Sequence, residues 1–314
     1  MSDSTISQPG LGAPGGSQGD STEAAGLDLA VRSQWSYARS RFFHHRLALV
    51  GLVGLVLIFG AGFLANWVAP YSYRIINYNE ILQHPSWHHL FGTDENGIDE
   101  LSRIIYGIRT SSEIGLIVAI VSTLFGLMVG AVAGYYGGWI DNILMRVTDL
   151  FLTLPVLAIL LAAAKLLLTV QPWQITVLLA VFFWTGIARI VRGVFLSLRE
   201  KEYVEAAKAS GAGDLRIMFR HILPNTLGPI VVNGTLAVGA AILTEAALSF
   251  LGFGIQPPNP SLGALINEGQ DYQPFDWWLQ IFPGLVIVLI VLCVNLVGDG
   301  LRDALDPTQR RMRA

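Results

Sequence analysis

The chain has 314 residues, of which 53% are hydrophobic and only 14% are charged, whereas soluble domains carry about 25% charged residues. This composition excludes a water-soluble enzyme core as the main body of the protein. The net charge of −3 says little about function, because a membrane protein distributes its charges by side of the bilayer and their sum hides this distribution. No nucleic-acid partner is expected. The single cysteine, Cys293, excludes an internal disulfide and a thiolate metal cluster.

The amino-terminal residues 1–31 are predicted to form a flexible cytoplasmic tail. The first 27 residues contain six glycines, five serines and two prolines but no lysine or arginine, and such a segment buries too little surface to offset the entropy of ordering. Residues 32–46 carry four arginines among aromatic side chains, which is typical of a segment facing cytoplasmic headgroups; a solvated linker is the alternative. The apolar stretch that begins at Leu47 is too long for a secretory signal and is expected to stay in the membrane.

Six apolar stretches predict six membrane-spanning helices. The first two are uncharged over 23 residues each, about 34 Å as a helix, which is enough to cross a hydrocarbon layer of about 30 Å. The third runs for 39 residues with Lys165 as its only charge, and the proline-containing segment 171–174 divides it into two spans. The predicted spans are residues 47–69, 114–136, the two halves of 150–188, 226–254 and 277–298.

Glycines repeat at four-residue spacing along the second span, at positions 126, 130 and 134. One face of this helix is therefore nearly bare backbone, and we expect it to approach a neighbouring helix closely.

The basic residues set the orientation of the spans. Sixteen of the 20 lysines and arginines lie in the amino-terminal segment, around Arg146, in residues 189–220 and in the carboxyl-terminal tail. Residues 259–276 contain three acidic residues and no basic one, as an exterior loop should. Both termini are therefore expected to be cytoplasmic.

The loop between the fourth and fifth spans, residues 199–225, is predicted to form two short helices with a joint. Acidic side chains near the start of the first helix favour its dipole, and small alanines leave that helix thin enough to lie in a groove on another protein. An amphipathic loop resting on the bilayer is the alternative. The residues concerned are Glu200, Glu202 and Glu205, and Ala206, Ala207 and Ala209.

Glycines and a proline delimit the second of these two helices. Gly211 and Gly213 permit the positive φ of a sharp reversal, Asp214 is expected to cap the second helix, and Pro224 is expected to close it. The apolar residues that fall on one face of this helix are Leu215, Met218, Phe219 and Ile222.

This loop resembles the signature of the permease subunits of bacterial ABC importers, which reads Glu-Ala-Ala, three residues, Gly, nine residues, and a tripeptide-spaced Leu-Pro. Glu205, Ala206, Ala207, Gly211, Leu223 and Pro224 match it, and His221 stands where many relatives place Ile. In that family the loop forms coupling helices that dock into a cleft of the ATP-hydrolysing subunit. The resemblance implies the same role for these residues and for Gly213 and Asp214.

Three further stretches, residues 91–109, 244–258 and 295–307, resemble one branch of this family, the C-type permeases of dipeptide and oligopeptide importers. The chain departs from the branch at Ile98, where relatives usually carry Arg, and at Leu262, where they often carry Trp. The resemblance implies an all-α integral membrane protein of the type I ABC importer permease fold, with six transmembrane helices and a cytoplasmic coupling-helix loop. The expected segments are a tail over 1–31, the first span and an exterior segment over 32–109, the permease core over 110–302 and a cytoplasmic tail over 303–314.

The resemblance also implies the partners and the cellular location. We expect a peptide importer in the bacterial plasma (inner) membrane, in which this chain forms a heterodimer with a second permease. Two cytoplasmic ATPases and an exterior peptide-binding protein would complete it. Within this class a nickel or glutathione importer is the alternative, and an ion-coupled secondary carrier is the alternative from another class.

No catalytic or metal site is expected in this chain. A phosphate-binding loop needs a lysine after glycine, and none of the three lysines follows one, so ATP and Mg²⁺ would be bound by the partner ATPases. The acidic residues at 94–100 lack the spacing of a calcium loop. His84, His88 and His89 are expected to be exterior surface rather than metal ligands.

Glu245 is the one acidic side chain within a predicted span. An unpaired carboxylate at mid-bilayer costs about 2.5–3.5 kcal/mol on insertion scales, so Glu245 should face protein or water. A structural hydrogen bond, for instance to a span of the partner subunit, and direct contact with the cargo both remain open. Asn233 and Asn295 are candidates for the same interior polar set, and Lys165 is assigned no transport role.

Overall fold

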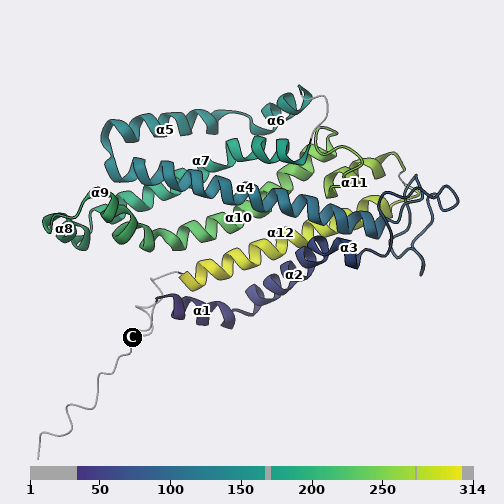
Figure 1. Cartoon of the computed structure of the whole chain (residues 1–314), viewed down its shortest axis with the longest axis horizontal. Helices are drawn as coiled ribbons and strands as arrows, with labels where there is room; N and C mark the ends of the chain where they lie inside the picture. The colour runs from purple at the N-terminus through teal and green to yellow at the C-terminus, as the bar shows by residue number, and fades with distance from the viewer. Residues whose placement is uncertain (1–33, 167–170, 273, 306–314) are drawn as a thin grey trace, which may run out of the picture.

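The computed structural model describes residues 34–166, 171–272 and 274–305. Within these ranges the chain folds into long helices that lie side by side and contains no strand (Figure 1). The predicted tail over 1–31 and nearly all of the predicted tail over 303–314 lie outside the described residues.

Five helices are long and apolar enough to cross a membrane, and a bent helix pair makes up to six. The five are α2 (Arg46–Phe63), α4 (Glu100–Tyr136), α7 (Pro172–Arg199), the helical rod Asp214–Phe250 and α12 (Trp278–Leu305). The rod consists of α9 (Asp214–Arg216), the π-helix η1 (Ile217–Ile222) and α10 (Leu223–Phe250). The shorter elements are α1 (Gln34–His44), α3 (Ala65–Val68), α8 (Glu202–Ala209), α11 (Leu262–Glu268) and the 3₁₀ turn η2 (Gly269–Tyr272).

The second span is longer than predicted, because α4 begins at Glu100 and not at residue 114. The Asp99 side chain accepts a hydrogen bond from the Ser102 amide at 2.8 Å and so caps the helix. Ile104 and Ile108 are buried one turn apart, and they hold the charged first turns of α4 against the bundle. The charged residues between 100 and 113 therefore belong to a continuous helix, whereas the prediction divided them between an exterior segment that ends at 109 and the permease core.

The segment predicted as the third span does not form one straight helix. It forms α5 (Gly138–Thr153) and α6 (Val156–Lys165), which meet at an angle of 76° and together count as at most one span. Pro155 explains the break, since a proline lacks the amide hydrogen and pushes the preceding residue out of the helical region; Leu154 has ψ 137°. Two ion pairs hold α5 along α7, Arg192–Asp141 at 2.5 Å and Arg189–Asp149 at 2.6 Å.

The glycine face of α4 packs against α7, as predicted from the spacing. A Cβ atom added to Gly126, Gly130 or Gly134 would lie 2.7, 2.4 or 2.6 Å from atoms of α7. No real Cβ contact is that short, so the two helices meet at a distance that only glycine permits.

The bundle has two distinct ends. Figure 1 shows α1, α8, α9 and the carboxyl-terminal end of α12 toward one end, which we call the elbow end because it carries the loop 200–225. The opposite end, the loop end, carries the segment 69–99 and α11. At the elbow end, His45 Nε2 lies 3.5 Å from Asp303 Oδ2, which brings the start of α2 beside the end of α12.

Candidate functional site

The loop 200–225, called the elbow below, begins where α7 ends and reverses direction after α8. The Gly211 amide donates to the Lys208 carbonyl at 2.9 Å, and the Ala212 amide donates to the Ala207 carbonyl at 3.1 Å. These two bonds form a Schellman motif, which needs a left-handed residue after the helix, and Gly211 has φ +79°. The expectation of a positive φ is thus confirmed for Gly211 and wrong for Gly213, whose φ is −70°.

The second helix of the elbow, which starts at Asp214 and is called the second limb below, differs from the prediction at both of its ends. Asp214 is not the cap but the first helical residue after Gly213, and its carboxylate accepts a hydrogen bond from the Tyr135 hydroxyl at 2.7 Å. Pro224 does not close the helix. It is the second residue of α10, which the π-helical turn η1 joins to α9 without interruption, so Pro224 lies within a continuous rod beside the turn where the hydrogen-bond pattern changes.

Apolar side chains anchor the elbow to the bundle. Val204, Ile217 and Ile222 are fully buried and belong to one apolar cluster with Val191 and Phe195 of α7. The four apolar residues predicted to share one helix face do not share it. Met218 and Ile222 are buried, whereas Leu215 and Phe219 are 67% and 64% exposed. The π turn changes the helical repeat between these positions, so the regular spacing did not predict their directions.

The residues of the Glu-Ala-Ala signature lie mainly on the outer surface of the elbow. The same elbow exposes the apolar side chains of Leu215 and Phe219, and exposed apolar surface of this kind suits contact with another protein. The exposed residues are Glu205, Ala206, Gly211, Gly213, Asp214 and Pro224, and the partly buried ones are Ala207, His221 and Leu223.

Glu245 lies in the interior of the bundle, as predicted. It is fully buried, and its carboxylate accepts hydrogen bonds from the Ser111 hydroxyl at 2.8 Å and from the Ser249 hydroxyl at 2.7 Å. Ser111 Oγ also accepts from the Leu262 amide at 3.4 Å, so this group connects α4, α10 and the start of α11. The hydrogen bonds of Glu245 are made within this chain.

Asn233 and Asn295 do not bond to Glu245, so the three residues do not form one interior polar set; a place for the two asparagines along the pathway stays a prediction. The Asn233 amide donates to the Pro229 carbonyl one turn earlier at 2.8 Å, and Asn295 is exposed on α12. Sequence reasoning missed Ser111 and Ser249, the residues that do meet the carboxylate. The position of Ser249 four residues after Glu245 was an available signal, because such residues share a helix face.

The loop end is tied together by a group that we call the Arg103 cluster: Arg103, Asp94, Glu100 and Glu268. The Arg103 guanidinium donates to Asp94 at 2.7 Å and also to Glu268, and it lies 3.8 Å from Glu100. The cluster joins α4 to the preceding segment and to α11.

His89 is buried at the loop end, contrary to the prediction that it is exterior surface. Its ring lies 2.9 Å from Asp99 and 3.4 Å from Glu80. Within the described part of the chain no group of histidines, cysteines and carboxylates could hold a metal ion.

Comparison with known proteins assigns these features to a family. The family described as the binding-protein-dependent transport system inner membrane component matches residues 126–311, which is more than half of the chain. The chain belongs to this family of permeases. Residues 33–85 of the permease match the N-terminal transmembrane domain of oligopeptide transport permease C. The resemblance drawn from the elbow signature and from the three further stretches is thereby confirmed, and the permease is a multi-pass membrane protein.

Three relatives show how far the likeness extends. The permease is 42% identical over 274 residues to the oligopeptide transport system permease protein OppC of Mycobacterium tuberculosis, covering 87% of this chain and 94% of the relative. It is 43% identical to a putative peptide transport system permease protein of Brucella abortus, covering 85% and 90%. It is 39% identical to the dipeptide transport system permease protein DppC of Haemophilus influenzae, covering 87% and 93%.

Proposed function

We propose that this permease is the membrane subunit of an ATP-driven importer of dipeptides or oligopeptides in the bacterial inner membrane. It would form the translocation path with a second, related permease and receive its cargo from an exterior peptide-binding protein. The names of the relatives support the peptide cargo. The observation that carries the proposal is the exposed elbow, whose signature residues lie on the surface while Val204 and Ile217 fasten it to the bundle.

The elbow end is proposed to face the cytoplasm. Seven of the chain's lysines and arginines lie between residues 189 and 220, and an excess of basic residues marks the cytoplasmic side. The start of α1 and the end of α12 lie toward the same end (Figure 1), which supports cytoplasmic positions for both termini.

Two cytoplasmic ATPases would supply the energy, because this sequence contains no lysine after a glycine and hence no phosphate-binding loop of that kind. ATP and Mg²⁺ would be bound there, and this chain would catalyse no reaction itself. Closure of the ATPases would push on the elbow. Since the second limb continues into α10, the push would reach the interior of the bundle and favour one of two arrangements of the spans, to the extent that the ATPases bind one arrangement more tightly.

Reversal of charge at the elbow tests this proposal. Glu205→Arg places a cation on the exposed surface of α8, so we expect the permease to insert and fold normally but to lose the ATPases on purification and to lose ATP-driven peptide uptake in proteoliposomes. Asp271→Arg makes the same change on an exposed residue of the loop end and should leave ATPase retention intact. Normal uptake by Glu205→Arg, or uptake driven by an ion gradient without the ATPases, would contradict the proposal.

A further inference from the structure

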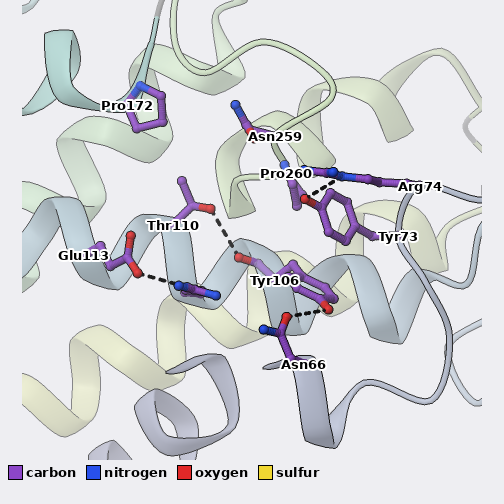
Figure 2. A pocket seen from close by; sticks show the side chains of 10 residues that line it. Asn66, Tyr73, Arg74, Tyr106, Thr110, Glu113, Pro172, Asn259 and Pro260 are labelled. Carbon is purple, nitrogen blue, oxygen red and sulfur yellow. Dashed lines mark hydrogen bonds and ion pairs between the residues drawn. The ribbon is translucent and has the colours of Figure 1, made fainter. Parts of the chain in front are cut away.

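A hollow of about 530 Å³ lies at the loop end of the permease, beside the first turns of α4 (Figure 2). Its walls come from α3, from the segment that follows α3, from α4, from the start of α7 and from the turn at 259–260. Sites for small ligands commonly measure about 300–1,000 Å³, so this hollow has room for a small molecule. It lies directly before the uncharged residues 114–136 of α4, where a solute would leave water.

The hollow carries charges of both signs, and Figure 2 shows Glu113 and Arg74 on its opposite sides. Glu113 Oε1 lies 2.9 Å from Arg109 Nε, and both side chains are nearly half exposed. An exposed pair of this kind contributes little to stability, and Glu113 Oε2 has no hydrogen bond within the described residues. One carboxylate oxygen is therefore available to a cationic group.

Arg74 provides the positive side. Its Nε donates to the Tyr73 hydroxyl at 2.9 Å, and within the described chain Arg74 has no carboxylate partner. A guanidinium whose remaining donors are available recognises a carboxylate through two parallel hydrogen bonds. The two sides of the hollow thus suit a ligand with an ammonium at one end and a carboxylate at the other.

Aromatic rings and amide groups complete the wall between the two charges. The rings of Tyr73 and Tyr106 have centroids 4.3 Å apart, and the Tyr106 hydroxyl donates to Asn66 Oδ1 at 3.0 Å, which fixes the orientation of the ring. Tyrosine rings offer apolar faces to the side chains of a ligand without requiring one sequence. Asn66 and Asn259 add hydrogen-bonding groups that suit a peptide backbone.

We propose that this hollow binds a short peptide by its two free ends, with Glu113 accepting the α-ammonium group and Arg74 donating to the α-carboxylate. The inference rests on the proposed peptide importer and adds to it a selection step within the permease: peptides with both termini free are held, whatever their side chains. The peptide would be held at the loop end before it enters the apolar part of the bundle.

Capped peptides test each half of the hollow separately. The purified complex of both permeases and the ATPases, without the binding protein, is titrated with trialanine, N-acetyl trialanine and trialanine amide. We expect trialanine to bind roughly tenfold more tightly than either capped form, because each cap removes one charged contact. Glu113→Gln should abolish the preference over the acetylated peptide alone, and Arg74→Gln should abolish the preference over the amide alone.

Asp271→Asn is the matched control, since Asp271 is an exposed acid of the loop end that does not line the hollow. It should keep both preferences. The inference is overturned if the wild-type complex binds none of the three peptides, if it does not discriminate among them, or if Glu113→Gln and Arg74→Gln keep both preferences. It is also overturned if these variants only weaken capture of the binding protein, because the hollow would then be a docking surface for that protein.

ATP-driven uptake of trialanine by the complete importer separates this inference from the proposed function. If the wild type imports the peptide while Glu113→Gln and Arg74→Gln leave the preferences unchanged, the hollow is not a peptide site and the importer proposal stands. If the wild type imports no peptide at all, the importer proposal itself is wrong.

Discussion

The two ends of the permease use their polar residues in opposite ways. At the loop end, the partly buried Arg103 donates to the buried Asp94 within the chain. At the elbow end, Glu205 and Gly211 are exposed, and so are the apolar Leu215 and Phe219 of the same elbow. Both ends carry patterns that resemble those of related permeases, but one pattern is bonded within the chain and the other lies exposed on the surface.

This difference teaches that a motif's place in the structure decides what a substitution does. A polar residue that is bonded within the chain contributes to folding, because its loss leaves buried groups without partners. A residue on an unpartnered surface contributes little to folding, and its loss appears when the partner binds. The following predictions set these two kinds of residue against each other.

The largest expected effect is at the loop end. Arg103→Ala leaves Asp94, Glu100 and Glu268 without their common cation, and breaking a buried ion pair costs about 3–5 kcal/mol. We expect a correspondingly lower free energy of unfolding in denaturant titrations of the detergent-purified permease. Arg189→Ala removes an arginine from an exposed ion pair with Asp149 and should cost less than about 1 kcal/mol. Equal losses in the two variants would show that the Arg103 cluster does not hold the loop end.

A smaller effect is expected where the glycine face of α4 packs against α7. In Gly130→Ala the added methyl group meets the Ala188 carbonyl oxygen at 2.4 Å, so α4 and α7 must separate, at a cost of about 1–3 kcal/mol. Gly193→Ala makes the same change on α7 where no atom lies within 4 Å, and it should stabilise the helix by up to about 1 kcal/mol. Thermal unfolding of the two variants measures the contrast, and a stable Gly130→Ala variant would argue against the close approach.

The smallest effect on stability is expected at the elbow. Phe219→Ser changes a side chain that is 64% exposed, so the free energy of unfolding should change by less than about 0.5 kcal/mol. Retention of the ATPases on the purified permease should nevertheless fall, since an exposed aromatic residue is a typical anchor of an interface. Met218→Ser, one position earlier but buried, should instead lower stability. Full ATPase retention by Phe219→Ser would remove Phe219 from the docking surface.

Much of the fold was predictable, because apolar runs between charges mark helices that can cross a membrane. The errors arose where charge or proline was interpreted too simply. Glu100 and Arg103 were placed in the exterior segment ahead of the second span, yet Asp99 at the cap and Ile104 and Ile108 one turn apart were signals of an early helix start. Pro155 was an available sign of the break between α5 and α6. Pro224 was interpreted as a helix end, although the helical rod continues through it directly after the π turn.

The sites were less predictable, because their contacts join residues that are far apart in the chain. The exposed elbow followed from a local pattern. The partners of Glu245 and Arg103 did not: Ser111 is 134 residues from Glu245, and Glu268 is 165 residues from Arg103. The hollow beside α4 likewise depends on how the segment containing Arg74 folds back over the helix, which no sequence period records.

The π turn at Ile217–Ile222 affects the directions in which side chains before and after it point. It lies in an uninterrupted rod from Asp214 to Phe250, and each residue of an α-helix advances the direction of the next side chain by about 100°. The π turn therefore sets the direction of Phe219 relative to Glu245: Phe219 is exposed, and Glu245, about seven turns further on, bonds to Ser111 in the interior. A single residue inserted into or deleted from the rod between them would change the direction of Phe219 relative to Glu245 by about 100°.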